Sequence, residues 1–443
     1  MNTFIFLIVV IIYLLLSLFV TEGDLFFPSN IVMLMYLLSL FFLVGEMNKW
    51  SGNISSKSLI LLLLGLTVYL VFSLTTLKIF SRVSLLKKKQ NSTRVKLTAK
   101  QELPVISDGI TVLIIIYEIF AIVKYYIDIK NISSSIRIYS SFGEMIGNYR
   151  NAAAYGNLKI SISTFSAYNY QIMLALAYIY ASIVIQYIVS KQKTSLKWKI
   201  LHYSPIIIYG ACTILKGGRN PLINLGLAII VMYFIKLKQI KGKNPLRFKT
   251  ICKLVLGGSV ALISFSSFRG LVGRTSDYTT FDYLAMYIGA PIKLFDLFIN
   301  SAQQMTHRFI GQETFTSFLG DIGKDVGSSN LEFRSSNGFG LGNVYTPFRR
   351  YYSDFGVWGL IILTAIQSFF YSFYYSKLVN NKVKGIDICT ILYSYLFVGV
   401  VYYSVDERLY TYFLSWYTIK GIIFMIIFSV ILPKIKLNLI KIN

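Results

Sequence analysis

The sequence predicts an all-α, polytopic integral membrane protein with about 11 membrane-spanning helices, within a range of roughly 10 to 12. Hydrophobic residues make up 55% of its 443 residues, and the mean hydropathy is +0.60. A water-soluble protein of this length could not bury so large an apolar fraction. Apolar runs of membrane-spanning length recur along the chain, which indicates repeated crossings of a bilayer.

The expected spans follow from the lengths of these apolar runs. Each approaches the ~20 residues that cross the hydrocarbon core of a bilayer as a helix. They lie at residues 3–20, 26–45, 59–80, 108–129, 167–189, 200–215, 221–237, 251–268, 355–376, 386–404 and 412–433. No internal repeat or soluble domain is evident, so we expect residues 1–443 to form a single membrane domain.

Positive charge divides the connections between the spans into two classes. Five connections are rich in lysine and arginine: residues 82–100, 191–199, 236–249, 376–385 and 434–441. They alternate correctly with the expected spans, so all five can lie in the cytoplasm under the positive-inside rule. The net charge of +25 is therefore explained by topology rather than by a nucleic-acid-binding surface. Counting back places the N-terminus outside and the acidic turn 21–24 inside, although acidic residues do not favour that side.

A long segment at residues 269–354 is expected on the external side. Loops longer than ~15 residues are usually functional or disordered, and this one is not of low complexity. It contains the apolar stretch "FDYLAMYIGAPIKLFDLFI" at 281–299, which Pro291 interrupts. We interpret this stretch as short interfacial or re-entrant helices packed on the membrane domain.

Several cations lie on the side where the charge rule disfavours them. They are Lys216 and Arg219 in a glycine-containing turn, Arg269 and Arg274 where a span ends, and the adjacent pair Arg349 and Arg350. Guanidinium and ammonium groups near helix ends suit the recognition of phosphate oxygens. The alternative is that these side chains merely reach the membrane interface.

Candidate proton acceptors are fewer. Asp354, His307 and Glu313 lie in or beside the external segment and could act as a general base. Asp354, or Ser353, could instead cap the helix expected at 355–376. Glu118 lies inside a span, where a carboxyl is either functional or a buried packing residue.

A metal site or other cofactor is not expected. The three cysteines, Cys212, Cys252 and Cys389, have no paired spacing, and there are only two histidines.

Four short motifs resemble the Wzy-type polymerases of oligosaccharide repeat units, the O-antigen and capsular polysaccharide polymerases. They are "KGGRN" at 216–220, "RGLVGR" at 269–274, "YIGAPIKLFD" at 287–296 and "NVYTPFRRYYSDFGVWGLII" at 343–362, of which the last is the most specific. The resemblance covers most of the chain as architecture, with one large external loop near the C-terminal third.

The resemblance implies a metal-independent membrane glycosyltransferase in the bacterial cytoplasmic membrane, with its active site on the external face. Such enzymes transfer a growing glycan from undecaprenyl pyrophosphate to a new lipid-linked repeat unit, making O-antigen, capsule or exopolysaccharide. The lysine and arginines named above would offset charge on the pyrophosphate leaving group, and Asp354, His307 or Glu313 would serve as the base. Expected partners are these lipid-linked oligosaccharides, the bilayer, and a chain-length regulator and flippase of the same pathway, with no nucleic acid.

Three other functions remain open from the sequence. One is an O-antigen-type ligase, which would transfer the glycan to lipid A or another acceptor. Another is a lipid-linked repeat-unit flippase or transporter, although transporters concentrate charged residues along their spans and keep external loops short. The third is a scaffold without enzymatic activity in a polysaccharide assembly complex.

Overall fold

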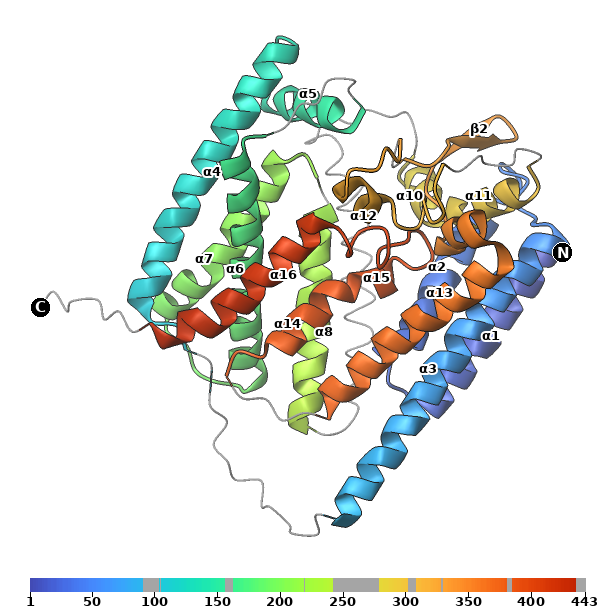
Figure 1. Ribbon diagram of the computed structural model, residues 1–443, viewed down its shortest axis with the longest axis horizontal. Coiled ribbons are helices and arrows are strands. Elements are labelled where there is room, and N and C mark those ends of the chain that lie inside the picture. Colours follow the sequence, from blue (N-terminus) through green and yellow to red (C-terminus); the bar gives the residue numbers. More distant parts are fainter. Residues whose placement is uncertain are drawn as a thin grey trace, which may run out of the picture.

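The computed structural model is built almost entirely of α-helices (Figure 1). It describes residues 1–90, 103, 105–155, 162–218, 220–241, 279–301, 308–327, 330–380 and 385–435. The helices are α1 (Asn2–Val20), α2 (Pro28–Gly45), α3 (Ser56–Gln90), α4 (Asp108–Ile136), α5 (Phe142–Tyr155), α6 (Thr164–Val189), α7 (Leu196–Leu215), α8 (Asn220–Lys241), α10 (Thr280–Ile288), α11 (Ala290–Ile299), α12 (Thr316–Asp321), α13 (Pro347–Val379), α14 (Ile388–Leu396), α15 (Val398–Val401), α16 (Trp416–Ile431) and the 3₁₀ turn η2 (Leu432–Lys434). Strands β1 (Arg334–Ser336) and β2 (Phe339–Gly342) form an antiparallel hairpin.

Eight helices in the described part of the chain are long and apolar enough to cross a membrane. They are α1, α2, α3, α4, α6, α8, α13 and α16 with η2. A helical, multi-pass membrane protein is thus confirmed, whereas the expected count of about 11 is not. The expected span 251–268 lies outside the described residues. Helix α7 forms over the expected span 200–215, but its first turns carry Lys197, Lys199 and His202, and the expected span 386–404 is split into α14 and the short α15.

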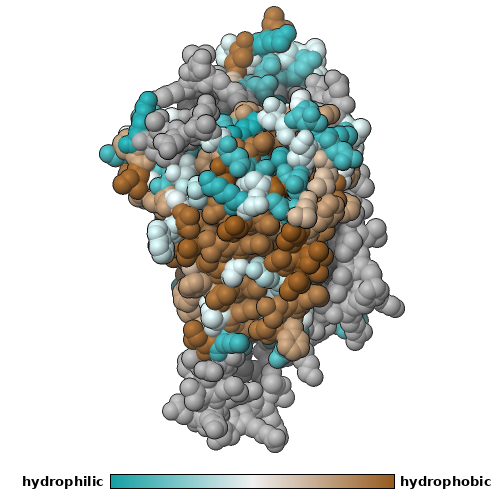
Figure 2. Space-filling view, turned by 90° about the vertical axis from the view of Figure 1, so that its right-hand side faces the viewer, coloured by the Kyte–Doolittle hydropathy of each residue, from teal (hydrophilic) through white to brown (hydrophobic). Residues whose placement is uncertain are grey.

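The surface pattern agrees with a bilayer setting. Figure 2 shows a broad belt of hydrophobic residues beneath a hydrophilic surface. Helix α1 illustrates the belt, because Ile8, Leu15 and Phe19 are 57%, 61% and 83% exposed. In water such exposure would be unfavourable, whereas lipid chains cover these side chains at no cost.

The helices pack around two hydrophobic cores, which we call the first and second half. The first half combines α1, α2, α3, α10, α11, α13 and α15. The second half combines α4, α5, α6, α7 and α16, and α8 and α14 contribute to both. Helices α3 and α13 pack closely: the hydroxyls of Ser73 and Ser372 lie 2.7 Å apart, and a Cβ at Gly65 would come within 2.4 Å of the Phe348 ring. Glycine at position 65 therefore allows the start of α13 to approach α3.

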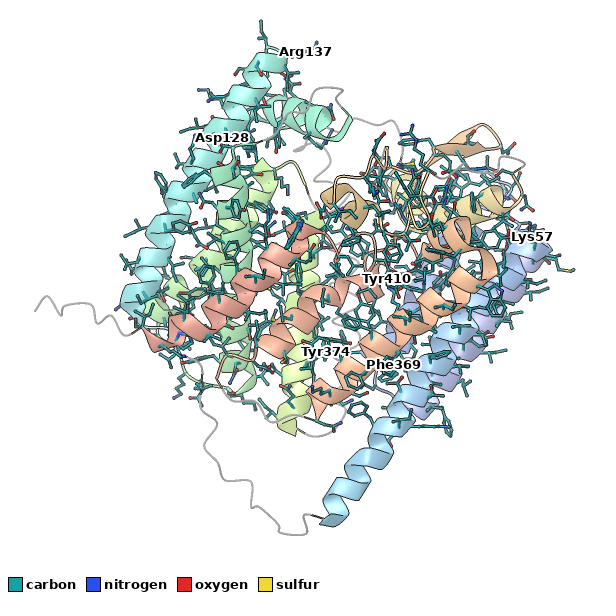
Figure 3. All side chains as sticks on the ribbon, viewed as in Figure 1. Lys57, Asp128, Arg137, Phe369, Tyr374 and Tyr410 are labelled. Atoms are coloured by element: carbon teal, nitrogen blue, oxygen red, sulfur yellow. The ribbon has the colours of Figure 1, made fainter. Side chains whose placement is uncertain are left out.

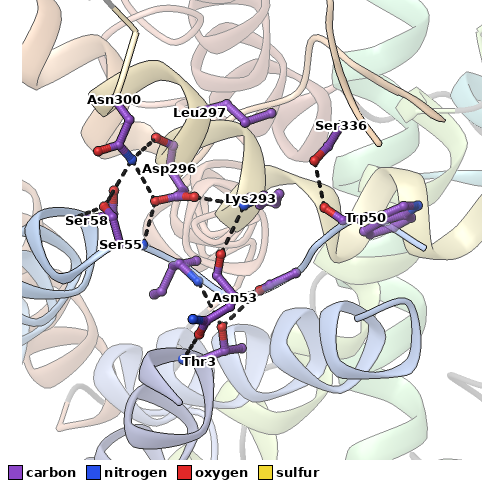
Figure 4. Close-up of polar contacts among 12 residues, drawn as sticks. Thr3, Trp50, Asn53, Ser55, Ser58, Lys293, Asp296, Leu297, Asn300 and Ser336 are labelled. Carbon is purple, nitrogen blue, oxygen red and sulfur yellow. Dashed lines mark hydrogen bonds and ion pairs between the residues drawn. The ribbon is translucent and has the colours of Figure 1, made fainter. Parts of the chain in front are cut away.

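One end of the molecule carries α10, α11, α12 and the β-hairpin, which lie together over the helix ends (Figure 1). We call the described residues between 279 and 346 the cap. Figure 4 shows how α11 is fastened to the N-terminal helices. The buried ion pair of Lys293 and Asp296 (2.9 Å) is central: Lys293 donates to the carbonyl of Asn53 (3.0 Å), and Asp296 accepts from the backbone N–H of Ser55 (2.8 Å).

The opposite end, which we call the basic end, gathers the α1–α2 turn and the last turns of α8 and α13. Asp24 in that turn forms an ion pair with Lys238, and the Tyr375 hydroxyl donates to its carboxylate at 2.8 Å. From α3, α8 and α13 the sequence continues into its lysine-rich segments. Asp24 of the acidic turn that the charge rule did not favour is therefore neutralised by Lys238.

Candidate functional site

The site is organised by a break in α13. Gly356 has φ 63° and ψ −151°, a conformation in effect restricted to glycine, and it divides α13 into two segments. The upper segment begins at Pro347 after the N-cap residue Thr346. The sequence predicted a helix only from residue 355, so Arg349 and Arg350 lie on a helical turn and not in a loop as expected.

Arg349 is fully buried between two carboxylates. Its guanidinium forms ion pairs with Glu313 and, at 2.7 Å, with Glu332, and the Arg349 side chain is 0% exposed. It also lies over the ring of Phe298 at 4.2 Å and that of Tyr345 at 5.3 Å. Both cap carboxylates are thereby held against α13, and the charge of Arg349 is already balanced.

Arg350 differs from its neighbour in its partners. It is 8% exposed, and its Nη1 donates to the backbone carbonyl of Glu313 at 2.8 Å. Among the described residues it forms no ion pair with a carboxylate. A carbonyl oxygen satisfies one of the five N–H donors of a guanidinium without neutralising its charge, so Arg350 retains the capacity to bind an anion.

Asp354 connects the cap to the upper segment of α13. Its two carboxylate oxygens accept hydrogen bonds from the backbone N–H groups of Glu313 (3.2 Å) and Thr314 (2.7 Å). The Thr411 hydroxyl donates to the carbonyl of Thr314 on the same turn. Asp354 therefore positions Glu313, 41 residues earlier in the chain.

The environment of Glu313 favours proton uptake. Burial raises the pKa of Glu313, the positive charges of Arg349 and Arg350 oppose this rise, and the negative charge of Asp354 adds to it. Its side chain is 12% exposed. The result is a carboxyl group that can exchange a proton above the usual range of glutamate, directly beside two arginines.

Glu332 was not identified from the sequence. Although burial alone would raise the pKa of Glu332, the attraction of Arg349 and its hydrogen bonds bring it below the ordinary value. It also pairs with Arg334 at 3.1 Å. Glu332 lies in the polar run "SSNLEFRSSNG", and nothing in that pattern distinguishes it from a solvated charge; only the folded chain brings it to Arg349.

Beneath this cluster, a further carboxylate, that of Glu407, supports the turn between α15 and α16. Glu407 is 2% exposed; it accepts from the backbone N–H of Thr411 (2.6 Å) and of Tyr410, and from the Tyr351 hydroxyl (3.1 Å). Burial raises the pKa of Glu407, and its hydrogen bonds with Tyr410 and Thr411 and the charge of Arg350 oppose the rise. Tyr410 lies between the cap and α13 (Figure 3), its ring 5.7 Å from that of Phe315 and 5.8 Å from that of Tyr351.

The other predicted site residues fall into two groups. Arg219, Arg269, Arg274 and His307 lie outside the described residues. Lys216 ends α7 in the second half: its ammonium group is 3.1 Å from the Tyr417 hydroxyl and 4.4 Å from the centre of the Tyr170 ring. Its contacts within the described chain are thus with tyrosines of the second half, and not with the arginine cluster.

Glu118 is fully buried in α4. Neither of its carboxyl oxygens has a hydrogen-bond partner within the described part of the chain. Across the same described ranges, no group of three or more His, Cys, Asp or Glu side chains is arranged to hold a metal ion.

The cluster at α13 combines two chemical capacities. Arg350 can bind an anion, and Glu313 can accept a proton at a position fixed by Arg349 and Asp354. No protein-family model, curated protein or solved structure matches this chain.

Proposed function

We propose that this protein is a membrane glycosyltransferase that polymerises oligosaccharide repeat units carried on undecaprenyl pyrophosphate, at the outer face of the bacterial cytoplasmic membrane. The observation that carries the proposal is the juxtaposition of Arg350, which forms no ion pair in the described chain, with the buried Glu313. The motif "NVYTPFRRYYSDFGVWGLII", which resembles the polymerase family, supplies three members of this cluster: Arg349, Arg350 and Asp354.

In the proposed reaction Arg350 binds the pyrophosphate of the donor. As the bond between the anomeric carbon and the pyrophosphate oxygen breaks, negative charge develops on that oxygen, and a fixed guanidinium stabilises it without a metal. Arg349 acts indirectly by holding Glu313 and Glu332 in place. Lys216, Arg219, Arg269 and Arg274 remain proposed contacts to the same lipid-linked substrates.

Glu313 is the base that the geometry favours. The acceptor hydroxyl oxygen attacks the anomeric carbon, and its proton passes to the Glu313 carboxylate as the new glycosidic bond forms. Asp354 is better suited to positioning, because both its oxygens accept backbone hydrogen bonds from the turn that carries Glu313. His307 remains an alternative base.

The location of the cluster suits an amphiphilic substrate. The cap covers the ends of the apolar helices (Figure 1), and the hydrophobic belt begins below it (Figure 2). A polyprenyl chain could stay in lipid while its pyrophosphate and sugars reach the junction of the cap with α13. The positive-inside rule assigns the cap to the external side, because the basic segments follow helices that end at the opposite face.

Deletion of the gene tests the reaction class. A polymerase deletion leaves surface polysaccharide with one repeat unit attached. Loss of a ligase leaves long lipid-linked chains unattached, and loss of a flippase leaves neither product. The surface polysaccharide is analysed on a gel, where its chain lengths appear as a ladder of bands. An unchanged ladder in the deletion strain would refute the polymerase function.

Point variants test the site. We expect Arg350→Ala and Glu313→Gln to stop chain growth while the protein still reaches the membrane. Arg308→Ala is the matched control, because Arg308 lies in the same cap segment, is 67% exposed and pairs with Asp325, which is 77% exposed. Normal ladders from both site variants would exclude this cluster as the active site.

A further inference from the structure

The turn between α15 and α16 carries a second group of polar and aromatic side chains, outside the arginine cluster. This turn, residues 402–415, is irregular backbone between two apolar helices. It packs on both halves: Leu409 belongs to the core of the first half, and the ring of Phe413 lies 5.8 Å from that of Tyr395 in the second. Irregular backbone at membrane depth is tolerated where it is buried in protein or lines a cavity, and broken helices often carry binding sites.

The turn is rigidly held. The Glu407 carboxylate binds two of its backbone N–H groups, as described above. Gly399 in α15 allows both α13 and the turn to approach, since a Cβ there would lie 2.5 Å from the Tyr371 hydroxyl of α13 and 3.2 Å from the Phe413 ring of the turn. The side chains next to Glu407 are therefore displayed in fixed positions.

Arg408 and Asp406 form an ion pair between two tyrosine rings. The Nε of Arg408 lies 2.8 Å from a carboxylate oxygen of Asp406. The guanidinium lies 4.8 Å from the centre of the Tyr402 ring and 5.2 Å from that of Tyr412. Arg408 is 12% exposed, whereas Asp406 is 35% and Tyr412 is 47% exposed, so one edge of the group is accessible.

This combination suits a sugar ring better than a phosphate. Asp406 neutralises Arg408, which leaves no excess positive charge for an anion. A carboxylate beside a guanidinium offers acceptors and donors to neighbouring hydroxyls, and an exposed aromatic face can cover the apolar C–H face of a pyranose.

We propose that Asp406, Arg408, Tyr402 and Tyr412 form a subsite that binds one neutral sugar residue of the oligosaccharide substrate. The identification of that sugar as part of a lipid-linked oligosaccharide rests on the proposed function. The subsite and the arginine cluster share their supports: Tyr351, which follows Arg350, donates to Glu407, and Thr411 donates to Thr314, which follows Glu313. The turn thus holds a sugar at a fixed distance from the group that binds pyrophosphate.

Saturation-transfer NMR on the purified full-length protein in nanodiscs tests the subsite. The probes are free glucose, galactose, N-acetylglucosamine and N-acetylgalactosamine, each measured with and without inorganic pyrophosphate. We expect at least one sugar to receive saturation, and Tyr412→Ala to weaken its binding roughly tenfold. Tyr412→Phe keeps the ring and should bind as the wild type does, whereas Arg408→Gln should weaken binding. Pyrophosphate should not compete.

The control is Trp416→Ala. Trp416 is also exposed (53%) and begins α16 just beyond the turn, where aromatic residues commonly mark the membrane interface. Its replacement should leave sugar binding unchanged. The subsite is refuted if no probe receives saturation, if Tyr412→Ala binds as the wild type does, if Trp416→Ala weakens binding as much as Tyr412→Ala, or if pyrophosphate displaces the sugar.

The subsite and the proposed function fail differently. Chain growth that stops in Arg350→Ala, together with sugar binding that ignores Tyr412→Ala, refutes only the subsite. Sugar binding that depends on Tyr412 and Arg408, together with normal chain growth in Arg350→Ala and Glu313→Gln, refutes the proposed reaction site but not the subsite.

Discussion

The two ends of the molecule use buried charge in different ways. At the basic end two cations each bind one carboxylate: Asp24 pairs with Lys238, and Asp387 pairs at 3.2 Å with Lys236, which is 0% exposed. At the cap end Arg349 alone binds two carboxylates, and Arg350 has none among the described residues. The buried ion pairs of the basic end are one-to-one, whereas at the cap end Arg350 makes no ion pair in the described chain and the charges of Glu313 and Glu407 act on it without direct contact.

This difference indicates that the ion pairs of the basic end stabilise the fold, whereas Arg350 at the cap end is available for binding. A one-to-one buried pair that joins two helix ends has its partners satisfied within the fold, and fixing those ends is a sufficient role for it. A buried guanidinium that donates only to a carbonyl loses hydration free energy that one hydrogen bond does not fully replace. An anion bound beside it would accept hydrogen bonds from its remaining N–H donors. Arg350 is therefore a stronger candidate than Arg349 for binding an anionic substrate.

The largest expected effect is on stability, in Arg349→Ala. The substitution leaves the largely buried Glu313 without its ion pair and Glu332 with Arg334 as its only ion-pair partner, which should cost about 3–5 kcal/mol of unfolding free energy. Denaturant unfolding of the purified protein in detergent measures it. Wild-type stability combined with lost activity would mean instead that Arg349 contacts the substrate directly.

Arg350→Ala should reverse that pattern. We expect turnover of lipid-linked donor to fall by about 10²–10³-fold, as for the loss of one preorganised charge-stabilising donor, with a smaller loss of stability than in Arg349→Ala. Arg350→Lys keeps the charge but not the planar fork and should recover part of the rate. Equal rates in the wild type, Arg350→Ala and Arg350→Lys would show that Arg350 does not take part in the reaction.

At the basic end, Lys236→Met should affect stability only. Asp387 keeps its hydrogen bonds from Thr390 (3.2 Å to N and 2.6 Å to Oγ1) and is 18% exposed, so we expect a loss of about 1–3 kcal/mol. Turnover per folded molecule should match the wild type. A selective loss of turnover would show that this end also takes part in the reaction.

The smallest expected effect is a displaced pH profile. Because burial raises the pKa of Glu313, a reaction that uses it as a base should slow as the pH falls through a value above the ordinary glutamate pKa of about 4.3. The effect on stability has the opposite sign: the contribution of Glu313 is present at low pH and is lost as the pH rises through its folded-state pKa. Rate and unfolding measurements across pH test both.

Glu313→Gln should remove both dependences and leave a slow, pH-independent residual rate. A rate that still falls on the acid side in this variant, with the midpoint unchanged, would assign the base to another group.

The sequence was sufficient for the class of fold because that class depends on local hydropathy. Apolar length located the helices that became α1, α2, α3, α4, α6, α8, α13 and α16 within a few residues at most boundaries. Hydropathy was insufficient where a helix is stabilised by residues that are distant in the sequence. The upper segment of α13 looks like a polar loop because Arg349 and Arg350 are charged, and the carboxylates and carbonyl that accommodate them come from the cap.

The site was predictable in part for the same reason. Arg349, Arg350, Glu313 and Asp354 were candidates from charge and position, and the fold brings all four together. Their roles depend on which side chains contact each other in the folded protein, and the spacing of residues along the chain does not reveal those contacts. Glu332 was missed because its only distinguishing feature is its contact with Arg349 at 2.7 Å.

Asp24 has a consequence for the biosynthesis of the protein. Its partner Lys238 follows 214 positions later, and Tyr375 follows 351 positions later. Because synthesis proceeds from the N-terminus, the hairpin of α1 and α2 enters the membrane with a carboxylate whose partners do not yet exist. Most of the second half can pack from consecutive helices as they emerge, whereas the first half closes only when α13 arrives. The first half of the molecule, although its synthesis begins first, is therefore completed only when α13 has been made. The arginine cluster forms at that stage, because Arg349 and Arg350 lie on α13.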